Sequence, residues 1–150
     1  MIVFADTSAL GSAYLDDEED GPWIRRILFA GADEVVVSEL ADVEFASLLD
    51  RARRAGRIDE DGVAERLSAY AGHSADGGPI GVLPLTRDTV ATARRFVLEA
   101  SVRTLDALHL ASADVLFEAS SDQVSILTRD VRQAAAARAL GFTLYPDPSG

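Results

Sequence analysis

Short apolar runs that alternate with helix-forming stretches limit most strictly how this chain can fold. The runs are about four to six residues long, which suits buried strands and is too short for helices. We predict strands at residues 2–5, 34–37, 80–85, 124–127 and 142–145. Strands that alternate with helices in this way predict a mainly parallel central sheet of about five strands with helices on both faces.

Signals for helix starts and ends occupy the segments between these strands. Ser38, Thr86 and Thr104 are expected to act as N-caps, and Gly56 is expected to follow a helix end. The predicted helices cover residues 7–15, 22–29, 38–55, 59–70, 86–100, 104–119 and 131–140. Residues 16–22, 72–81 and 146–150 are expected to be loose connections or tail. The sequence therefore predicts an α/β fold, a three-layer α/β/α sandwich, with residues 1–150 forming one domain.

Composition excludes several classes of protein. Because the chain has no Cys, disulfides, thiolate catalysis and zinc–thiolate sites are excluded. The net charge of -11 argues against a broad basic surface that coats nucleic acid, and it favours a cation or a basic polypeptide as partner. No apolar run approaches the roughly 20 residues of a membrane helix, and no basic segment precedes the first apolar run. We therefore expect a cytoplasmic protein without a membrane partner.

Two aspartates follow predicted strands and precede predicted helices. They are Asp6 and Asp130, and each could simply cap the helix that follows it. Ligands of parallel sheets gather at the carboxyl ends of the strands, where both residues would lie. If their strands are neighbours, the backbones are about 4.8 Å apart, and the two carboxylates repel unless a cation lies between them.

Two further acids lie on predicted helices. Glu44 lies on an apolar stripe between Leu40 and Leu48, where a Glu is rarely buried without a partner. Asp106 lies in the first turn of its helix, a position that favours a carboxylate by about 0.3–1 kcal/mol. His109, one turn later, is expected to be a packed or supporting residue rather than a metal ligand. Each acid has a structural explanation singly, but the set predicts a cation site.

The chain resembles the PIN-domain ribonucleases, in particular the VapC toxins of toxin–antitoxin pairs. The similarity spans nearly the whole chain and follows the order of four segments. These are the strand leading into Asp6-Thr7-Ser8-Ala9-Leu10, the segment Ser38-Glu39-Leu40-Ala41-Asp42-Val43-Glu44, the motif Leu105-Asp106-Ala107-Leu108-His109-Leu110-Ala111, and Leu127-Thr128-Arg129-Asp130 with its following helix and Gly141-Phe142.

The resemblance implies a metal-dependent endoribonuclease toxin that cleaves RNA phosphodiester bonds with a metal-activated water. It implies that Asp6 and Asp106 bind Mg²⁺ or Mn²⁺, and that Glu44 and Asp130 complete the catalytic set directly or through water. It also implies two supporting hydroxyls, on Ser8 and Thr128. The expected partners are an RNA substrate, a cognate VapB-type antitoxin and a second copy of the chain in a homodimer. An oxygen-only donor set suits Mg²⁺, and one or two ions remain possible.

Four carboxylates alone would repel an RNA backbone, so arginines must hold the strand. Each candidate can also be explained as a solvated position on a helix face. The candidates are Arg51, Arg53, Arg54 and Arg57, and further Arg25, Arg26, Arg94, Arg95 and Arg103.

Other interpretations remain beside the toxin. One is a solitary PIN-domain nuclease outside a toxin–antitoxin pair, and another is a non-catalytic PIN-like binding domain. A phosphoryl-transfer enzyme of the haloacid-dehalogenase type needs a second Asp where Ser8 stands, and it needs a Lys. A phosphosignalling receiver domain needs a Lys as well. The chain contains no Lys, which argues against both of these classes.

Overall fold

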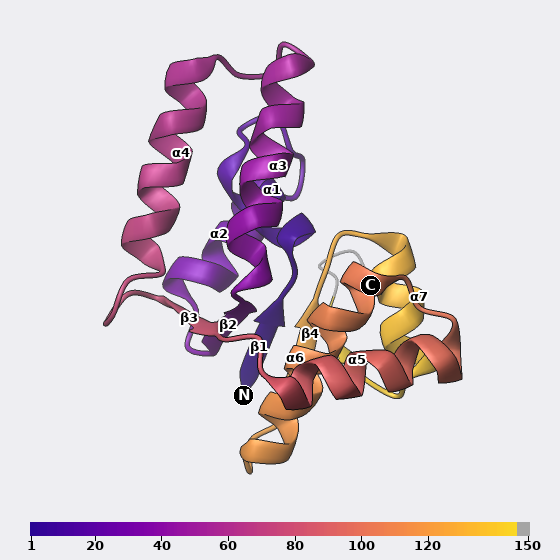
Figure 1. Ribbon diagram of the computed structural model, residues 1–150. Coiled ribbons are helices and arrows are strands. Elements are labelled where there is room, and N and C mark those ends of the chain that lie inside the picture. The colour runs from indigo at the N-terminus through magenta and orange to yellow at the C-terminus, as the bar shows by residue number, and fades with distance from the viewer. Residues whose placement is uncertain (147–150) are drawn as a thin grey trace.

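A five-stranded parallel sheet forms the centre of the computed structural model, which describes residues 1–146 (Figure 1). The strands are β1 (Ile2–Ala5), β2 (Glu34–Ser38), β3 (Ile80–Leu83), β4 (Val124–Leu127) and β5 (Thr143–Leu144). Their order is β3-β2-β1-β4-β5, and every neighbouring pair is parallel. The predicted α/β class and five-stranded parallel sheet are thus confirmed. Of the predicted tail, residues 147–150 lie outside the described residues.

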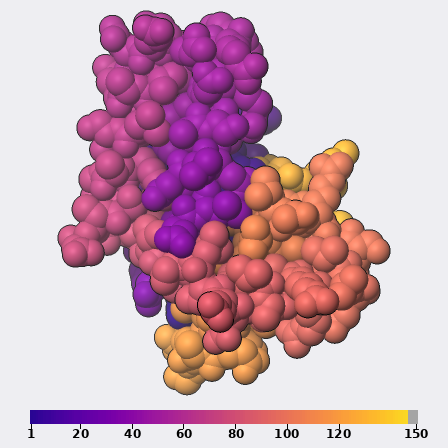
Figure 2. Space-filling model, in the orientation of Figure 1, coloured from indigo at the N-terminus to yellow at the C-terminus, as the bar shows by residue number. Residues whose placement is uncertain are grey.

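Helices cover both faces of this sheet. They are α1 (Thr7–Tyr14), α2 (Gly21–Ala30), α3 (Leu40–Arg54), α4 (Glu60–His73), α5 (Arg87–Ala100), α6 (Thr104–Ala119) and α7 (Val131–Ala139). Residues of α1–α4 form one buried cluster with the sheet, and residues of α5–α7 form the other. In the space-filling view, α3 and α4 stand out as one lobe and α5 and α6 belong to a second (Figure 2).

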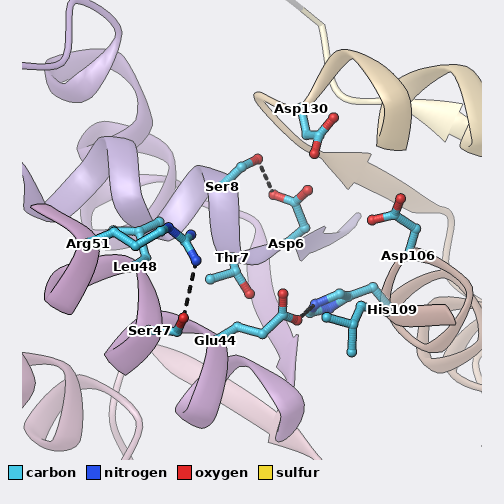
Figure 3. A pocket seen from close by; sticks show the side chains of 11 residues that line it. Asp6, Thr7, Ser8, Glu44, Ser47, Leu48, Arg51, Asp106, His109 and Asp130 are labelled. Atoms are coloured by element: carbon cyan, nitrogen blue, oxygen red, sulfur yellow. Dashed lines mark hydrogen bonds and ion pairs between the residues drawn. The ribbon is translucent and has the colours of Figure 1, made fainter. Parts of the chain in front are cut away.

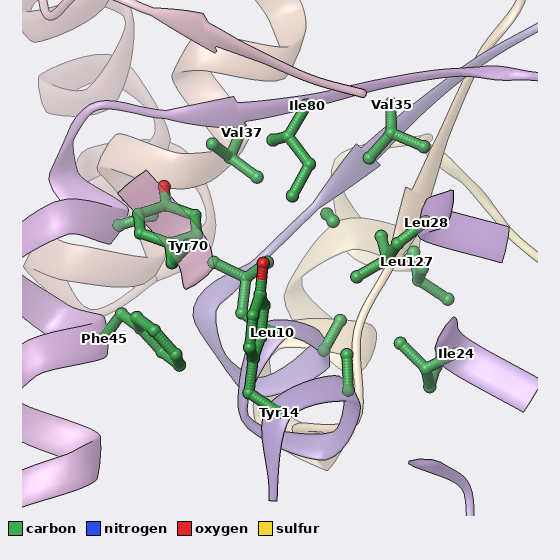
Figure 4. Close-up of a cluster of buried hydrophobic side chains, with 14 of the residues drawn as sticks. Leu10, Tyr14, Ile24, Leu28, Val35, Val37, Phe45, Tyr70, Ile80 and Leu127 are labelled. Atoms are coloured by element: carbon green, nitrogen blue, oxygen red, sulfur yellow. The ribbon is translucent and has the colours of Figure 1, made fainter. Parts of the chain in front are cut away.

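The central strand β1 contributes to both clusters. Successive side chains of a strand point to opposite faces, so Val3 and Ala5 pack on one face and Ile2 and Phe4 on the other. The first cluster surrounds Leu10 and carries several aromatic rings, as Figure 4 shows. Because β1 is buried on both faces and paired on both edges, the position of the residue that follows it is tightly fixed.

Two of the three predicted N-caps are wrong. Ser38 ends β2, because it remains paired with Leu83 of β3, and Glu39 precedes α3 without a side-chain cap. Thr104 is the first residue of α6, and Arg103 precedes it without a side-chain cap. Thr86 does cap α5: its hydroxyl accepts a hydrogen bond from the Thr89 backbone N–H at 3.2 Å.

The end of α3 is the predicted one. Gly56 has a φ of +75°, the left-handed conformation that glycine adopts readily after a helix. The turn directs the chain into the antiparallel neighbour α4.

Within residues 1–146, no helix combines the length and the apolar character that a bilayer span requires.

Candidate functional site

All four predicted acids line one pocket of about 220 Å³ at the carboxyl edge of the sheet (Figure 3). Asp6 directly follows β1, and Asp130 follows β4 after a short loop. Glu44 reaches the pocket from α3, and Asp106 reaches it from the first turn of α6. The neighbouring strands β1 and β4 place two of the acids, as the parallel pairing requires.

Asp6 is buried and held by hydroxyl groups. Its Oδ1 accepts hydrogen bonds from Ser8 Oγ at 2.6 Å and from the Ala9 backbone N–H at 3.0 Å. Its Oδ2 accepts a hydrogen bond from the hydroxyl of Thr128. Burial raises the pKa of the Asp6 carboxyl, and these hydrogen bonds oppose the rise. Asp6 therefore caps α1 and also presents a carboxylate that is costly to charge without a cation.

Asp130 caps the helix that follows it in the same way. Its Oδ1 accepts hydrogen bonds from the backbone N–H of Arg132 at 2.8 Å and of Gln133 at 3.3 Å. Within the described residues, no group donates to its Oδ2. Asp130 therefore caps α7 and also lines the acidic pocket.

Asp106 lies in a field of negative charge. Burial raises the pKa of its carboxyl, and the nearby carboxylates of Asp130 and Asp6 raise it further. Figure 3 shows the three side chains facing the same space. Like charges brought together in this way favour either a proton or a bound cation.

His109 packs under the pocket and contacts Glu44. The ring is buried, with 4% of its side chain exposed, and its Nε2 contacts the Glu44 carboxylate. Among the described residues, the buried Nδ1 has no hydrogen-bond partner. The hydroxyl of Thr7, which also lines the pocket, is buried and without a partner in the same part of the chain.

The acids are gathered but do not form a closed ligand cage. In residues 1–146, no three His, Cys, Asp or Glu side chains are close enough to hold one ion together. Mg²⁺ keeps several waters and needs only one or two carboxylates in direct contact. The all-oxygen donors, the raised pKa values of Asp6 and Asp106 and the unengaged Asp130 Oδ2 fit such an ion.

Arg51 is the one predicted arginine that lines this pocket, as far as the described residues go. Its Nη1 donates to Ser47 Oγ at 3.1 Å. By contrast, Arg53 and Arg54 pair with Asp50, and the guanidinium of Arg57 pairs with two acids of the α1–α2 loop. These three guanidinium groups are therefore already engaged with carboxylates of the protein itself.

The sequence predictions named Arg51 but did not distinguish it from the other candidate arginines. Glu44, Ser47, Leu48 and Arg51 have spacings of three, four and seven residues, which puts them on one helix face. That spacing would have selected Arg51 from the other arginines. The pocket residues Thr7 and Leu105 had no such signal, because they only neighbour acids in the sequence.

Comparisons with known proteins agree with this architecture. The family model described as PIN domain matches residues 3–139. The solved structure of Mycobacterium tuberculosis VapC20, described as a Sarcin-Ricin loop cleaving toxin, has a TM-score of 0.68 at 18% sequence identity and covers 97% of this chain and 99% of that one. PAE2754 from Pyrobaculum aerophilum has a TM-score of 0.60 at 19% identity, covering 91% of this chain and 79% of that one. No curated protein sequence matches the chain significantly.

Proposed function

The chain belongs to the PIN domain family, and on this premise we propose that it is a metal-dependent endoribonuclease that acts in its acidic pocket. One observation carries the proposal: four acids from four separate elements line one pocket. Structural explanations account for Asp6 and Asp130 as helix caps, but they do not explain why Glu44 and Asp106 converge on the same space. In this proposal, residues 1–150 form one PIN domain.

The side chains have separate tasks in this proposal. Asp6 and Asp106 would hold Mg²⁺ or Mn²⁺, and Glu44 and Asp130 would complete the set directly or through water. When bound, the ion supplies a water of lowered pKa and offsets negative charge on the phosphate oxygens. Ser8 and Thr128 keep the Asp6 carboxylate in one orientation through their hydrogen bonds.

Substrate binding needs positive charge beside these carboxylates. Arg51 can supply it, because its guanidinium lies at the pocket wall and its observed partner is the neutral hydroxyl of Ser47. A guanidinium presents paired donors that match a phosphate group. Arg51 would therefore hold a phosphate of the RNA against the acids.

We further propose that this nuclease is a VapC-type toxin. The similarity to VapC20, a toxin by its description, extends over nearly the full length of both chains. On this proposal, a cognate VapB-type antitoxin blocks the pocket, the chain forms a homodimer, and it acts in the cytoplasm on RNA. Co-expression with any short reading frame found immediately upstream, followed by light scattering of the purified complex, tests the partners.

Asn substitutions separate the capping role of Asp6 and Asp130 from the catalytic one. Asn caps helices about as well as Asp, so Asp6→Asn and Asp130→Asn are expected to keep the fold. Both variants should lose Mg²⁺-dependent cleavage of a single-stranded RNA, because the amide does not replace a metal-binding carboxylate. The measurement is a cleavage time course with and without Mg²⁺, alongside circular dichroism.

Asp59→Asn is the matched control for this experiment. Asp59 caps α4 by accepting a hydrogen bond from the Gly62 backbone N–H at 2.7 Å, and it does not line the acidic pocket. Its variant should cleave RNA at the rate of the unmodified protein. If Asp6→Asn and Asp130→Asn also cleave at that rate, the acids are helix caps only and the proposed function is wrong.

A further inference from the structure

A second pocket of about 420 Å³ adjoins the acidic one and shares Asp130 with it. Its volume lies in the range of about 300–1,000 Å³ that small-molecule sites occupy. The lining comes from α2, the end of β4, one face of α7 and the chain after β5. Because Asp130 belongs to both pockets, a group bound here lies directly beside the acidic site.

Two aromatic rings form one wall of this second pocket. The rings of Trp23 and Tyr145 lie with their centroids 6.3 Å apart and their planes tilted by 55°. Both are half-buried and pack against the core cluster around Leu10. The Tyr145 backbone N–H donates to Ile126 O at 2.8 Å, and its hydroxyl donates to Asp33 at 3.4 Å. The wall is therefore held in place before any ligand arrives.

One face of α7 also lines this second pocket. Val131, Ala134 and Arg138 have spacings of three and seven residues, which aligns them along the pocket. Ala134 leaves space, while the buried residues Gln133 and Ala137 face the core instead. Within residues 1–146, the Arg138 side chain has no ion-pair partner, although the protein carries a net charge of -11.

We propose that this second pocket binds a nucleobase of single-stranded RNA next to the bond that the acidic pocket cleaves. The base stacks against Trp23 and Tyr145, and Arg138 contacts the adjoining phosphate. Unpaired bases stack on aromatic side chains in this way, whereas bases in a duplex remain covered by their neighbours. The inference rests on the proposed ribonuclease function and adds that the substrate is unpaired at the cleaved position.

The chain provides a direct probe, because Trp23 is its only tryptophan. In the cleavage-deficient Asp6→Asn protein, a short single-stranded oligoribonucleotide is expected to quench the fluorescence of Trp23. An abasic oligonucleotide of equal length should quench far less at the same concentration, because it offers phosphates without bases. Labelled oligoribonucleotide anisotropy measures the dissociation constant independently of Trp23.

Substitutions test each contact in the same binding assay. Trp23→Ala should weaken binding roughly 5- to 150-fold, the range expected for the loss of one stacked base. Tyr145→Leu should weaken it in the same direction, and it remains informative if Trp23→Ala fails to fold. Phe117→Ala is the aromatic control, since Phe117 is 51% exposed and lines neither pocket. Arg138→Gln should weaken binding of both oligonucleotides, whereas Arg54→Gln should not.

The outcomes separate this inference from the proposed function. If RNA binds by anisotropy and is cleaved by the unmodified protein, but Trp23 fluorescence and the Trp23→Ala affinity are unchanged, the base site is refuted and the nuclease stands. Equal quenching by the abasic oligonucleotide also refutes base stacking. If RNA neither binds nor is cleaved, the proposed function fails and this inference fails with it.

Discussion

A single carboxylate can stabilise a helix and still disfavour its own charge. Asp6 accepts three hydrogen bonds, yet burial raises the pKa of its carboxyl. Burial and two neighbouring carboxylates raise the pKa of Asp106 as well, and no helix-capping bond opposes that rise. The two residues therefore differ in what their removal should do to stability.

Replacement of Asp106 by Asn is expected to stabilise the metal-free protein at pH 7. The pKa of Asp106 is higher in the folded state than in the unfolded state. Its contribution to stability is therefore fully present below the pKa of the unfolded state and is lost as the pH rises through the pKa of the folded state. Melting temperatures in chelator at pH 4 and pH 7 should show that Asp106→Asn gains most at pH 7. With Mg²⁺, the variant should lose the metal-dependent gain of the unmodified protein.

Asp88→Asn serves as the control, because Asp88 is exposed on α5 and lines neither pocket. It should not raise the melting temperature at pH 7, because the first turn of α5 favours the carboxylate that this change removes. A destabilised Asp106→Asn protein in chelator at pH 7 would show that the carboxylate is not under electrostatic strain.

At the scale of elements, local signals predicted the strands that carry the site better than they predicted the helix starts. The predicted bounds of β1 and β4 agree with the structure, and strand ends alone put Asp6 and Asp130 at one edge. Ser38 was expected to cap α3 but stays in the sheet, because its pairing with β3 is a contact between distant segments. The bond from Thr128 to Asp6 was beyond sequence reasoning for the same reason: it depends on which strands become neighbours.

The close approach of α1 and α2 makes Gly21 sensitive to substitution. A Cβ atom at Gly21 would lie 2.7 Å from the backbone oxygen of Ser12, which cannot move away as a flexible side chain would. Gly21→Ala should therefore lower the free energy of unfolding by about 1–3 kcal/mol, the usual cost of overpacking. Urea denaturation of the purified variant measures the change.

Gly72→Ala is the matched comparison for Gly21→Ala. Gly72 lies in α4, and a Cβ atom added there would meet nothing within 4 Å beyond its chain neighbours and the backbone of its own helix. Alanine at this site should raise the free energy of unfolding by up to about 1 kcal/mol, because it restricts the unfolded chain and favours the helix. Equal effects of the two substitutions would contradict the tight α1–α2 contact.

For the whole molecule, the net charge of -11 should make stability depend on salt in two distinct ways. NaCl is expected to raise the melting temperature gradually, because it screens repulsion among the acids. Mg²⁺ or Mn²⁺ should raise it further at matched ionic strength, since a ligand that binds only the native state stabilises it by about 2.7 kcal/mol at 100 times its dissociation constant. Calorimetry of the same protein in both salts separates the effects.

The Asp6→Asn protein is the control for this comparison. It should keep the gradual gain from NaCl and lose the additional gain from the divalent ion. A divalent ion that stabilises the unmodified protein no more than NaCl at equal ionic strength would remove the support for a specific metal site.

The bond between Thr128 and Asp6 joins residues 122 positions apart, and this separation has a consequence for protein synthesis. At about 5–20 residues per second, a ribosome needs roughly 6–24 seconds between adding Asp6 and adding Thr128. Throughout that interval, the nascent chain has no β4 to pair with β1 and no Asp130 to complete the pocket. The proposed ribonuclease site therefore cannot be complete until both β4 and Asp130 have been synthesised.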